Sequence, residues 1–308
     1  MIENTLWVEK YRPKTLDTYI SSEQLKTAFS YYVKTNDIPH LLLHGSAGGG
    51  KTTLAKIIAN TIADGNYLYI NASDENSVDT VRDKIKLFAS TVGFGGLKIV
   101  ILDEADFTTP NFQAALRNVM ETYSRNTRFI LTCNYVEKII EPLHSRCQKF
   151  NILPPSKKDV AILAANILNS ENVKFDNKTL ASVININFPD IRKTINTLQK
   201  LSITGTLEIP EEIQTDQALN TKIIELLKKS SLKQLERFTE IRKLIADGLV
   251  RDFNPIYRSI YDGIDSFPEK TRFVILATIA DAQYKDAFVV DHEINAMNAF
   301  FTIIDELG

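Results

Sequence analysis

The residues best suited to chemistry form an eight-residue run that fits the phosphate-binding pattern G-x-x-x-x-G-K-[ST]. The run is Gly45-Ser46-Ala47-Gly48-Gly49-Gly50-Lys51-Thr52. It follows an apolar stretch at 41–43 and opens a helical pattern over 53–62, which places backbone N–H groups and a helix N-terminus around a phosphate. Lys51 is then expected to reach the β- and γ-phosphates, and the Thr52 hydroxyl to ligate magnesium. In this composition a chance match arises about once in 200 chains, so a phosphate loop is favoured over a glycine-rich turn with an unrelated lysine.

A pair of acids follows another apolar run. Residues 99–102 read Ile-Val-Ile-Leu, and Asp103 and Glu104 come directly after them. Ligands bind open α/β sheets at the carboxyl ends of the strands, where these acids are expected. We predict that Asp103 holds magnesium, directly or through water, and that Glu104 polarises the attacking water. The alternative is two solvated acids at a strand end, but their pairing with the phosphate loop favours the catalytic interpretation.

Two further polar residues have two interpretations each. Asn134 follows the apolar run 129–133, where its carboxamide either contacts a γ-phosphate or attacking water, or only forms a turn. Arg146 precedes the last apolar run as either a surface charge or a group that completes a transition state in a neighbouring subunit. For each of the two residues, residue type and spacing alone leave both interpretations open.

The elements that must position these residues follow an alternating pattern. In the first half of the chain, helical patterns separate five short apolar runs, at 38–44, 67–70, 98–103, 128–133 and 149–153. Continuous apolarity is typical of strands buried on both faces, as in a parallel sheet. Thr109 and Pro110 form a helix start between two of these runs. The pattern predicts a doubly wound α/β domain that ends near residue 153.

The second half of the chain is predicted to be helical. After Pro154-Pro155, helical patterns begin at Ser156 and then cover 177–187 and 190–201, which indicates a small three-helix unit. The stretch 205–214 is predicted to be a linker, and apolar residues at helical spacing continue to the end. We therefore predict three domains: 1–153 (α/β), 154–208 (small helical) and 216–308 (larger helical).

Composition excludes several classes of protein. The chain has 308 residues, 24% of them charged, with a net charge of −2 and two cysteines. No apolar run approaches the roughly 20 residues that span a membrane, so no membrane association is expected. The cysteines are too few for a disulfide framework, which indicates a reduced, intracellular setting. Without a basic excess, contact with nucleic acid must use a local patch or an assembly.

Taken together, the motifs resemble the AAA+ ATPase subunits of sliding-clamp loaders, similar to replication factor C. Asp103-Glu104-Ala105-Asp106 matches the family's Walker B box, and Thr132-Cys133-Asn134 is similar to its first sensor. Ser145-Arg146-Cys147 resembles the arginine-finger box, and residues 187–195 resemble the second sensor. The resemblance implies an AAA+ P-loop parallel-sheet domain, a small helical lid and an all-α collar for oligomerisation.

The resemblance also implies roles for individual residues. The segment Trp7–Pro13 looks like the family's N-terminal signature, so Val8, Glu9, Lys10, Tyr11 and Ile20 are expected to contact the adenine base. Arg192 is expected to contact the γ-phosphate from the lid, and Arg146 to act on a neighbouring subunit. The full predicted sets are as follows: catalytic Lys51, Asp103, Glu104, Asn134, Arg146 and Arg192; ATP-binding Val8, Glu9, Lys10, Tyr11, Ile20, Gly48, Gly49, Gly50, Lys51, Thr52, Thr53 and Arg192; metal-binding Thr52 and Asp103.

The resemblance also implies DNA contacts from helices that line the inside of a spiral of subunits, and the segment 78–89 is the candidate helix in this chain. Its apolar positions make one face, and Arg82 and Lys86 lie one turn apart on another face, where they are placed to contact phosphates. The alternative is a solvated face, because Asp79 and Asp83 lie among the basic residues.

The function that follows from the resemblance is that of a motor subunit using ATP and Mg²⁺. ATP binding is expected to open and hold a sliding clamp, and hydrolysis on primer–template DNA to release it. The implied partners are further copies of the chain, a small clamp-loader subunit in a pentamer, the clamp and the DNA. Alternatives are another AAA+ DNA-processing ATPase, of helicase-loader or branch-migration type, and a nucleotide-binding scaffold that does not hydrolyse ATP.

Two details refine the resemblance. The Phe188-Pro189-Asp190 form of the second sensor looks like the large subunit of T-even-type bacteriophage loaders, which implies a location in the host cytoplasm. The phosphate loop lacks the two prolines usual in the family. Because proline restricts φ, the loop is expected to be more flexible and to bind nucleotide less tightly.

Overall fold

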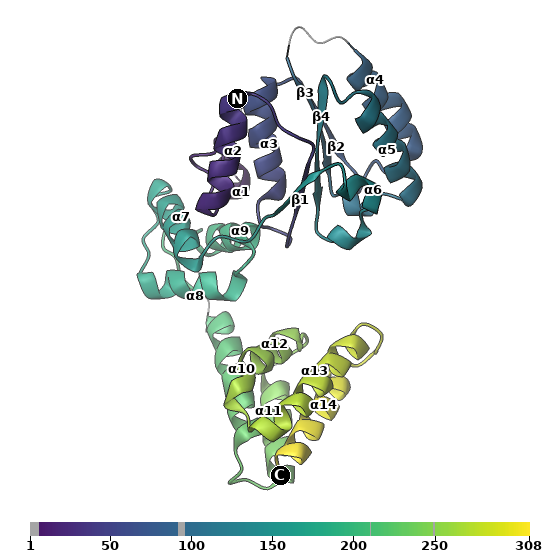
Figure 1. Ribbon diagram of the computed structural model, residues 1–308. Coiled ribbons are helices and arrows are strands. Elements are labelled where there is room, and N and C mark those ends of the chain that lie inside the picture. The colour runs from purple at the N-terminus through teal and green to yellow at the C-terminus, as the bar shows by residue number, and fades with distance from the viewer. Residues whose placement is uncertain (1–5, 92–95, 210, 249) are drawn as a thin grey trace. The chain divides into compact units, whose positions relative to one another are not determined.

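The computed structural model describes residues 6–91, 96–209, 211–248 and 250–308, and only the backbone of residues 82 and 211–218. The chain forms two compact units, Met1–Glu208 and Ile209–Gly308. The first contains the sheet and all the predicted site residues, and the second is helical (Figure 1).

A five-stranded parallel sheet forms the centre of the first unit. The strands are β1 (Leu41–His44), β2 (Tyr67–Asn71), β3 (Lys98–Asp103), β4 (Thr127–Cys133) and β5 (Gln148–Asn151). Their order is β2-β3-β4-β1-β5, with every neighbouring pair parallel. The predicted parallel sheet is therefore confirmed. Because β1 lies between β4 and β5, and β3 between β2 and β4, the carboxyl ends of β1, β3 and β4 meet at one edge.

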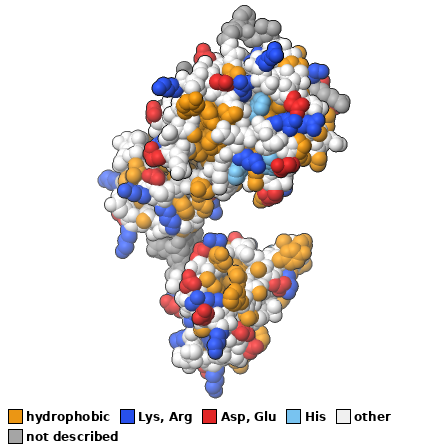
Figure 2. All heavy atoms as spheres, viewed as in Figure 1, with side chains coloured by type: hydrophobic (Ala, Val, Ile, Leu, Met, Phe, Trp, Pro, Cys, Tyr) orange, Lys and Arg blue, Asp and Glu red, His pale blue; other side chains and the backbone are white. Residues whose placement is uncertain are grey.

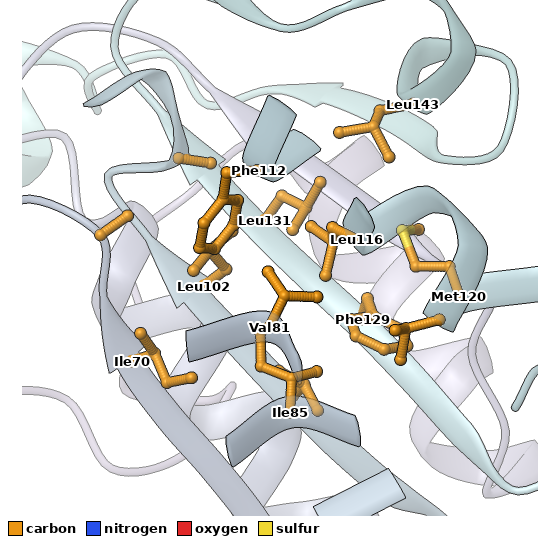
Figure 3. Packing of buried hydrophobic residues seen from close by; sticks show 14 of the residues in the cluster. Ile70, Val81, Ile85, Leu102, Phe112, Leu116, Met120, Phe129, Leu131 and Leu143 are labelled. Atoms are coloured by element: carbon orange, nitrogen blue, oxygen red, sulfur yellow. The ribbon is translucent and has the colours of Figure 1, made fainter. Parts of the chain in front are cut away.

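Helices cover both faces of the sheet (Figure 1). Successive strand residues point to opposite faces, so Leu41 and Leu43 pack with α2 (Glu23–Thr35) and α3 (Lys51–Ala63), while Leu42 packs on the other side. The other face carries η1 (Thr80–Ile85), α4 (Lys86–Ser90), α5 (Pro110–Thr122) and α6 (Glu141–His144). Figure 3 shows Val81, Ile85, Phe112 and Leu116 from these helices packed against Leu102, Phe129 and Leu131 of the strands. Short 3₁₀ turns η2 (Ala105–Phe107) and η3 (Val136–Lys138) follow β3 and β4.

Three helices with side-chain caps complete the first unit. They are α7 (Lys157–Ser170), α8 (Asn177–Asn187) and α9 (Ile191–Leu201), and their N-termini are capped by Ser156, Asp176 and Asp190. The short helix α1 (Trp7–Lys10) lies against α9, where Trp7 N donates to Gln199 Oε1 over 3.0 Å. The N-terminal segment is therefore held on the three-helix unit as well as near the phosphate loop.

The second unit is a bundle of helices. They are α10 (Glu211–Lys228), α11 (Gln234–Asp247), α12 (Asn254–Asp262), α13 (Arg272–Asp286) and α14 (His292–Leu307), with 3₁₀ turns η4 (Ile264–Ser266) and η5 (Glu269–Thr271). Apolar side chains from all five helices form one core. The predicted linker 205–214 is wrong for its last residues, because α10 begins at Glu211, where acidic residues favour a helix N-terminus. Among the described residues, no helix is long and apolar enough to cross a membrane.

Candidate nucleotide-binding site

The phosphate loop joins β1 to α3 in a conformation that requires glycine. Gly45, Gly48 and Gly50 have φ values of 146°, 74° and 90°. A Cβ on Gly45 would lie 2.4 Å from the Ile152 carbonyl oxygen, and a Cβ on Gly48 would lie 2.3 Å from Asp190 Oδ1. The loop therefore packs closely against both the sheet edge and the N-terminus of α9.

Lys51 begins α3 with its side chain buried, 8% exposed. Its ammonium donates to the Gly45 and Ser46 carbonyl oxygens over 2.9 and 2.8 Å, and to Asn134 Oδ1 over 2.8 Å. Burial lowers the pKa of Lys51, and nearby acidic groups including Asp103 oppose that shift. The contact with Asn134 joins the phosphate loop to the end of β4, as expected if both act on one phosphate group.

Asp103 ends β3 and is 6% exposed. Its Oδ1 accepts hydrogen bonds from Thr52 Oγ1, over 2.8 Å, and from Thr132 Oγ1. Its Oδ2 accepts from Tyr69 Oη over 2.8 Å. The adjacent Thr52 hydroxyl and Asp103 carboxylate are hard oxygen ligands of the kind that Mg²⁺ prefers. The described residues contain no group of three or more His, Cys, Asp or Glu able to hold a metal.

Glu104 directly follows Asp103 and lines the same pocket. It has a left-handed backbone, φ 56°, and its N–H donates to Thr132 Oγ1 over 3.1 Å. A positive φ is uncommon for a residue with a side chain and is found at functional sites held by their surroundings. Here the Thr132 hydroxyl donates a hydrogen bond to Asp103 and accepts one from the Glu104 N–H. It thereby fixes the positions of the two acids relative to each other.

Asp106 holds the loop that carries Asn134. Its side chain is 5% exposed, and Oδ2 accepts hydrogen bonds from the backbone N–H groups of Asn134 and Tyr135, each over 3.2 Å. Asp106 belongs to the Asp-Glu-Ala-Asp run. Its contact with Asn134 could not be predicted from the sequence, because the contact joins residues 28 positions apart.

We expect Asp106→Ala to lower ATP turnover about tenfold, because two part-buried backbone donors lose their acceptor and Asn134 moves away from Lys51. An unsatisfied buried donor costs about 1–3 kcal/mol, so the unfolding temperature should also fall. Turnover and thermal unfolding would be measured beside Asp106→Asn, which keeps the shape and one acceptor oxygen. A folded Asp106→Ala variant with unchanged turnover would contradict this role.

The pocket beside the phosphate loop contains most of the predicted nucleotide contacts. It is lined by Val8, Tyr11, Ile20, Gly48, Gly49, Gly50, Lys51, Thr52, Thr53, Asp103, Glu104, Asn134 and Arg192. Lining residues that the sequence analysis did not predict include Pro13, Tyr19, Thr132, Leu163 and Ile195. Leu163 and Ile195 come from α7 and α9, so the three-helix unit forms one apolar wall of the pocket.

Two predicted base contacts do not line this pocket. Glu9 pairs with Arg12, which lowers the pKa of Glu9, and Lys10 pairs with Glu171 over 2.8 Å. Val8 and Tyr11, the residue that caps the C-terminus of α1, are three residues apart, a spacing that places two side chains on one side of a helical turn. A helix presents only part of a continuous segment to one ligand, so the prediction that 8–11 all contact the base gains no support from the lining of this pocket for Glu9 and Lys10.

Arg146 lies outside the pocket of its own chain. Its guanidinium donates to the Pro142 carbonyl oxygen over 2.7 Å and pairs with Glu121 of α5. The side chain is 33% exposed. Within this chain the arginine therefore contacts no residue of the phosphate loop, and any action on a phosphate must reach another molecule.

The candidate DNA-binding segment is less regular than predicted. Residues 80–85 form the π-helix η1, which continues directly into α4, and Val81 and Ile85 are buried. Lys86 is exposed, while the side chain of Arg82 lies outside the described residues. The spacing of Arg82 and Lys86 on a regular α-helix is therefore replaced by the wider turn of a π-helix.

Comparison with known proteins agrees with this architecture. Residues 41–155 match the ATPase family associated with various cellular activities (AAA), and residues 156–210 match the AAA+ ATPase lid domain of the sliding-clamp-loader large subunit. A Thermotoga maritima RuvB structure has a TM-score of 0.57 and 18% identity over 83% of this chain and 88% of its own, a likeness that concerns the fold alone. The fold and site thus define an AAA+ ATPase.

Curated relatives identify the family within this class. The chain is 35% identical to the replication factor C small subunit of Sulfurisphaera tokodaii, over 99% of this chain and 97% of the relative. It is 37% identical to the Saccharolobus solfataricus protein of the same name, over 95% and 92%. A probable replication factor C subunit 5 from Dictyostelium discoideum is 42% identical over 66% of this chain and 61% of its own. The chain therefore belongs to the replication factor C family, and it is an ATPase subunit of a sliding-clamp loader in DNA replication. These relatives are archaeal and eukaryotic, so they give no support to the predicted bacteriophage origin.

Proposed function

We propose that this chain uses ATP with Mg²⁺ and converts hydrolysis into release of a loaded clamp. The observation that carries the proposal is the convergence of two contacts in one pocket: Lys51 Nζ to Asn134 Oδ1 and Thr52 Oγ1 to Asp103 Oδ1, each 2.8 Å. They bring the phosphate loop together with the ends of β3 and β4. Lys51 binds the β- and γ-phosphates, Glu104 orients and deprotonates the attacking water, and Asn134 and Arg192 contact the γ-phosphate.

The metal proposed here is Mg²⁺, held by Thr52 and Asp103. Bound Mg²⁺ supplies positive charge that offsets the negative charge of the phosphate oxygens. The close approach of the two protein oxygens, and the burial of Asp103, support this assignment. Val8, Tyr11 and Ile20 provide the surface proposed for the adenine base, together with apolar residues of α7 and α9.

The three-domain division, 1–153, 154–208 and 216–308, also remains our proposal. The first two domains together make up one compact unit that ends at Glu208, and the nucleotide pocket includes residues from both. The helices α7, α8 and α9 would act as a lid that responds to nucleotide through Arg192. The remaining helices would act as the collar that joins subunits.

The collar carries exposed apolar side chains suited to such joining. On α13 and after it, Phe273, Tyr284, Phe288 and Val290 are exposed, and Figure 2 shows hydrophobic side chains gathered on the visible face of this unit. A groove on the same unit is lined by Leu235, Phe238, Ile294, Met297 and Phe301. Large exposed apolar surfaces favour association. They support our proposal that further copies of the chain and a small clamp-loader subunit form a pentamer.

The remaining partners are a sliding clamp and primer–template DNA. Arg82 and Lys86 are the proposed phosphate contacts, which would be independent of base sequence and sensitive to salt. The match of the lid to a large-subunit family supports our finer proposal of a large subunit. The proposal that the loader is of the T-even bacteriophage type rests on the resemblance of Phe188-Pro189-Asp190 alone. In that case the protein acts in the host cytoplasm.

The proposed sequence of events follows from these sites. ATP binding assembles a spiral of subunits that opens and holds the clamp, with Arg146 of each subunit directed at the nucleotide of a neighbour. Primer–template DNA then completes the subunit interfaces, and hydrolysis releases the clamp on the DNA.

The test is the steady-state ATPase rate of the protein alone, with primer–template DNA, with the clamp and partner subunit, and with all of them. We expect the full mixture to exceed the sum of the separate stimulations, because only the complete assembly aligns Arg146 with a neighbour's nucleotide. A rate that neither DNA nor the clamp changes would contradict the motor proposal and favour a nucleotide-binding scaffold.

A further inference from the structure

Tyr69 contacts the candidate metal-holding carboxylate from the neighbouring strand. It is the third residue of β2, opposite Ile101 of β3 in the parallel register, and Asp103 lies two residues further along β3. Its hydroxyl donates to Asp103 Oδ2 over 2.8 Å. No motif predicted this residue, and the contact exists because β2 and β3 are adjacent in the sheet.

The two oxygens of Asp103 have different donors. Oδ1 accepts from the hydroxyls of Thr52 and Thr132, which belong to α3 and β4. Within the described part of the chain, Tyr69 provides the one hydrogen bond found on Oδ2. Rotation of the carboxylate would break bonds on both sides, so Tyr69 helps to keep Oδ1 directed toward Thr52.

The Tyr69 ring is itself held in place. Lys56 of α3 places its ammonium 4.2 Å from the ring centroid, in a cation–π contact. Lys56 lies one turn beyond Thr52 on the same helix, so the ring and the Thr52 hydroxyl are fixed by the same element.

We propose that Tyr69 is a positioning residue that orients Asp103 and thereby sets the divalent-cation affinity of the nucleotide site. This inference rests on the proposed Mg–ATP chemistry and adds a residue to it. Side chains that hydrogen-bond a metal ligand typically change metal affinity or activity about 10–100-fold when replaced. Tyr69 is 37% exposed, so an effect near the lower end of this range is expected.

The test removes only the hydroxyl, in Tyr69→Phe. The matched control is Tyr67→Phe on the same strand, because the Tyr67 hydroxyl has no hydrogen bond within the described residues. Binding of Mn²⁺ to the complex of protein and ATPγS would be followed by electron paramagnetic resonance, and nucleotide binding would be measured separately in EDTA. We expect Tyr69→Phe to weaken Mn²⁺ binding about tenfold and to leave metal-free nucleotide binding unchanged.

Turnover gives a second measurement. The Mg²⁺ concentration for half-maximal ATPase activity should rise by a similar factor in Tyr69→Phe, with the rate recovering at high Mg²⁺, while Tyr67→Phe behaves like the wild type. Unchanged metal dependence in Tyr69→Phe, even with a lower unfolding temperature, would overturn the inference and leave the proposed function intact. If the wild-type protein showed no ATPase turnover that depends on a divalent cation, the proposed function itself would be overturned.

Discussion

Glu104→Gln is expected to lower the stimulated ATPase rate at least 100-fold and to leave ATP binding within about twofold of the wild type. General-base catalysis contributes about 10²–10⁴-fold, which corresponds to roughly 3–5 kcal/mol of transition-state stabilisation. Glutamine preserves size and hydrogen bonding but cannot accept the proton of the attacking water. The loss should therefore fall on the rate of the chemical step.

The structure supports the choice of Glu104, rather than the adjacent Asp103, as the proposed general base. Asp103 is buried, and three hydroxyl groups hydrogen-bond to its carboxylate, so it is not free to take a proton from water. Glu104 is half-buried, lines the pocket, and is placed beside Asp103 by its left-handed backbone and by the bond from its N–H to Thr132. We therefore propose separate roles for the two adjacent acids, with Asp103 suited to hold a cation and Glu104 to act on water.

Single-turnover hydrolysis and equilibrium ATP binding would measure these two quantities separately. Glu141→Gln on α6 is a suitable control, because it removes a carboxylate that does not line the pocket. If Glu104→Gln keeps more than a tenth of the stimulated rate, another group must activate the water, and the catalytic assignment would be wrong.

Arg146→Ala is expected to remove stimulated turnover in the assembly by about 10³-fold while the isolated chain binds ATP normally. An arginine supplied to a transferring phosphoryl group contributes about 10³–10⁵ to the rate. Arg146 does not line its own pocket, and its guanidinium lies against α5 and α6. We therefore expect its contribution to depend on a neighbouring subunit and the basal rate of the isolated chain to stay unchanged.

Mixing two variants separates action within a subunit from action between subunits. Assemblies that contain both Arg146→Ala and Glu104→Gln chains should regain part of the stimulated rate, because an intact Glu104 site can receive Arg146 from its neighbour. Each variant alone should remain inactive. Arg117→Ala on α5 provides the control for loss of a nearby surface arginine. If the mixture stays inactive, or if Arg146→Ala alone keeps full turnover, the action between subunits is contradicted.

Local sequence predicted the elements with good accuracy. The run 98–103 coincides with β3, and the remaining four apolar runs overlap β1, β2, β4 and β5. The central strands β1, β3 and β4 are largely buried on both faces, so their apolarity is continuous and easy to detect, whereas the edge strand β5 is mostly exposed. The start of α5 was also predicted, because Thr109 caps it and Pro110 occupies its first turn. The linker prediction failed in part, since Gly205 and Pro210 indicate a break but not its length.

The sequence by itself determined the phosphate loop and the two acids at the end of β3, because the requirements for glycine, lysine and carboxylate residues are local. It also indicated a parallel sheet around them, because the apolar runs that form the strands are local features. Only the tertiary structure decided which strand ends meet. Asn134 reaches Lys51 because β4 lies beside β1, and Tyr69 reaches Asp103 because β2 lies beside β3. Strand order depends on how helices pack on both faces and on the path of each crossover. These are long-range contacts that leave no periodic signal in any one segment.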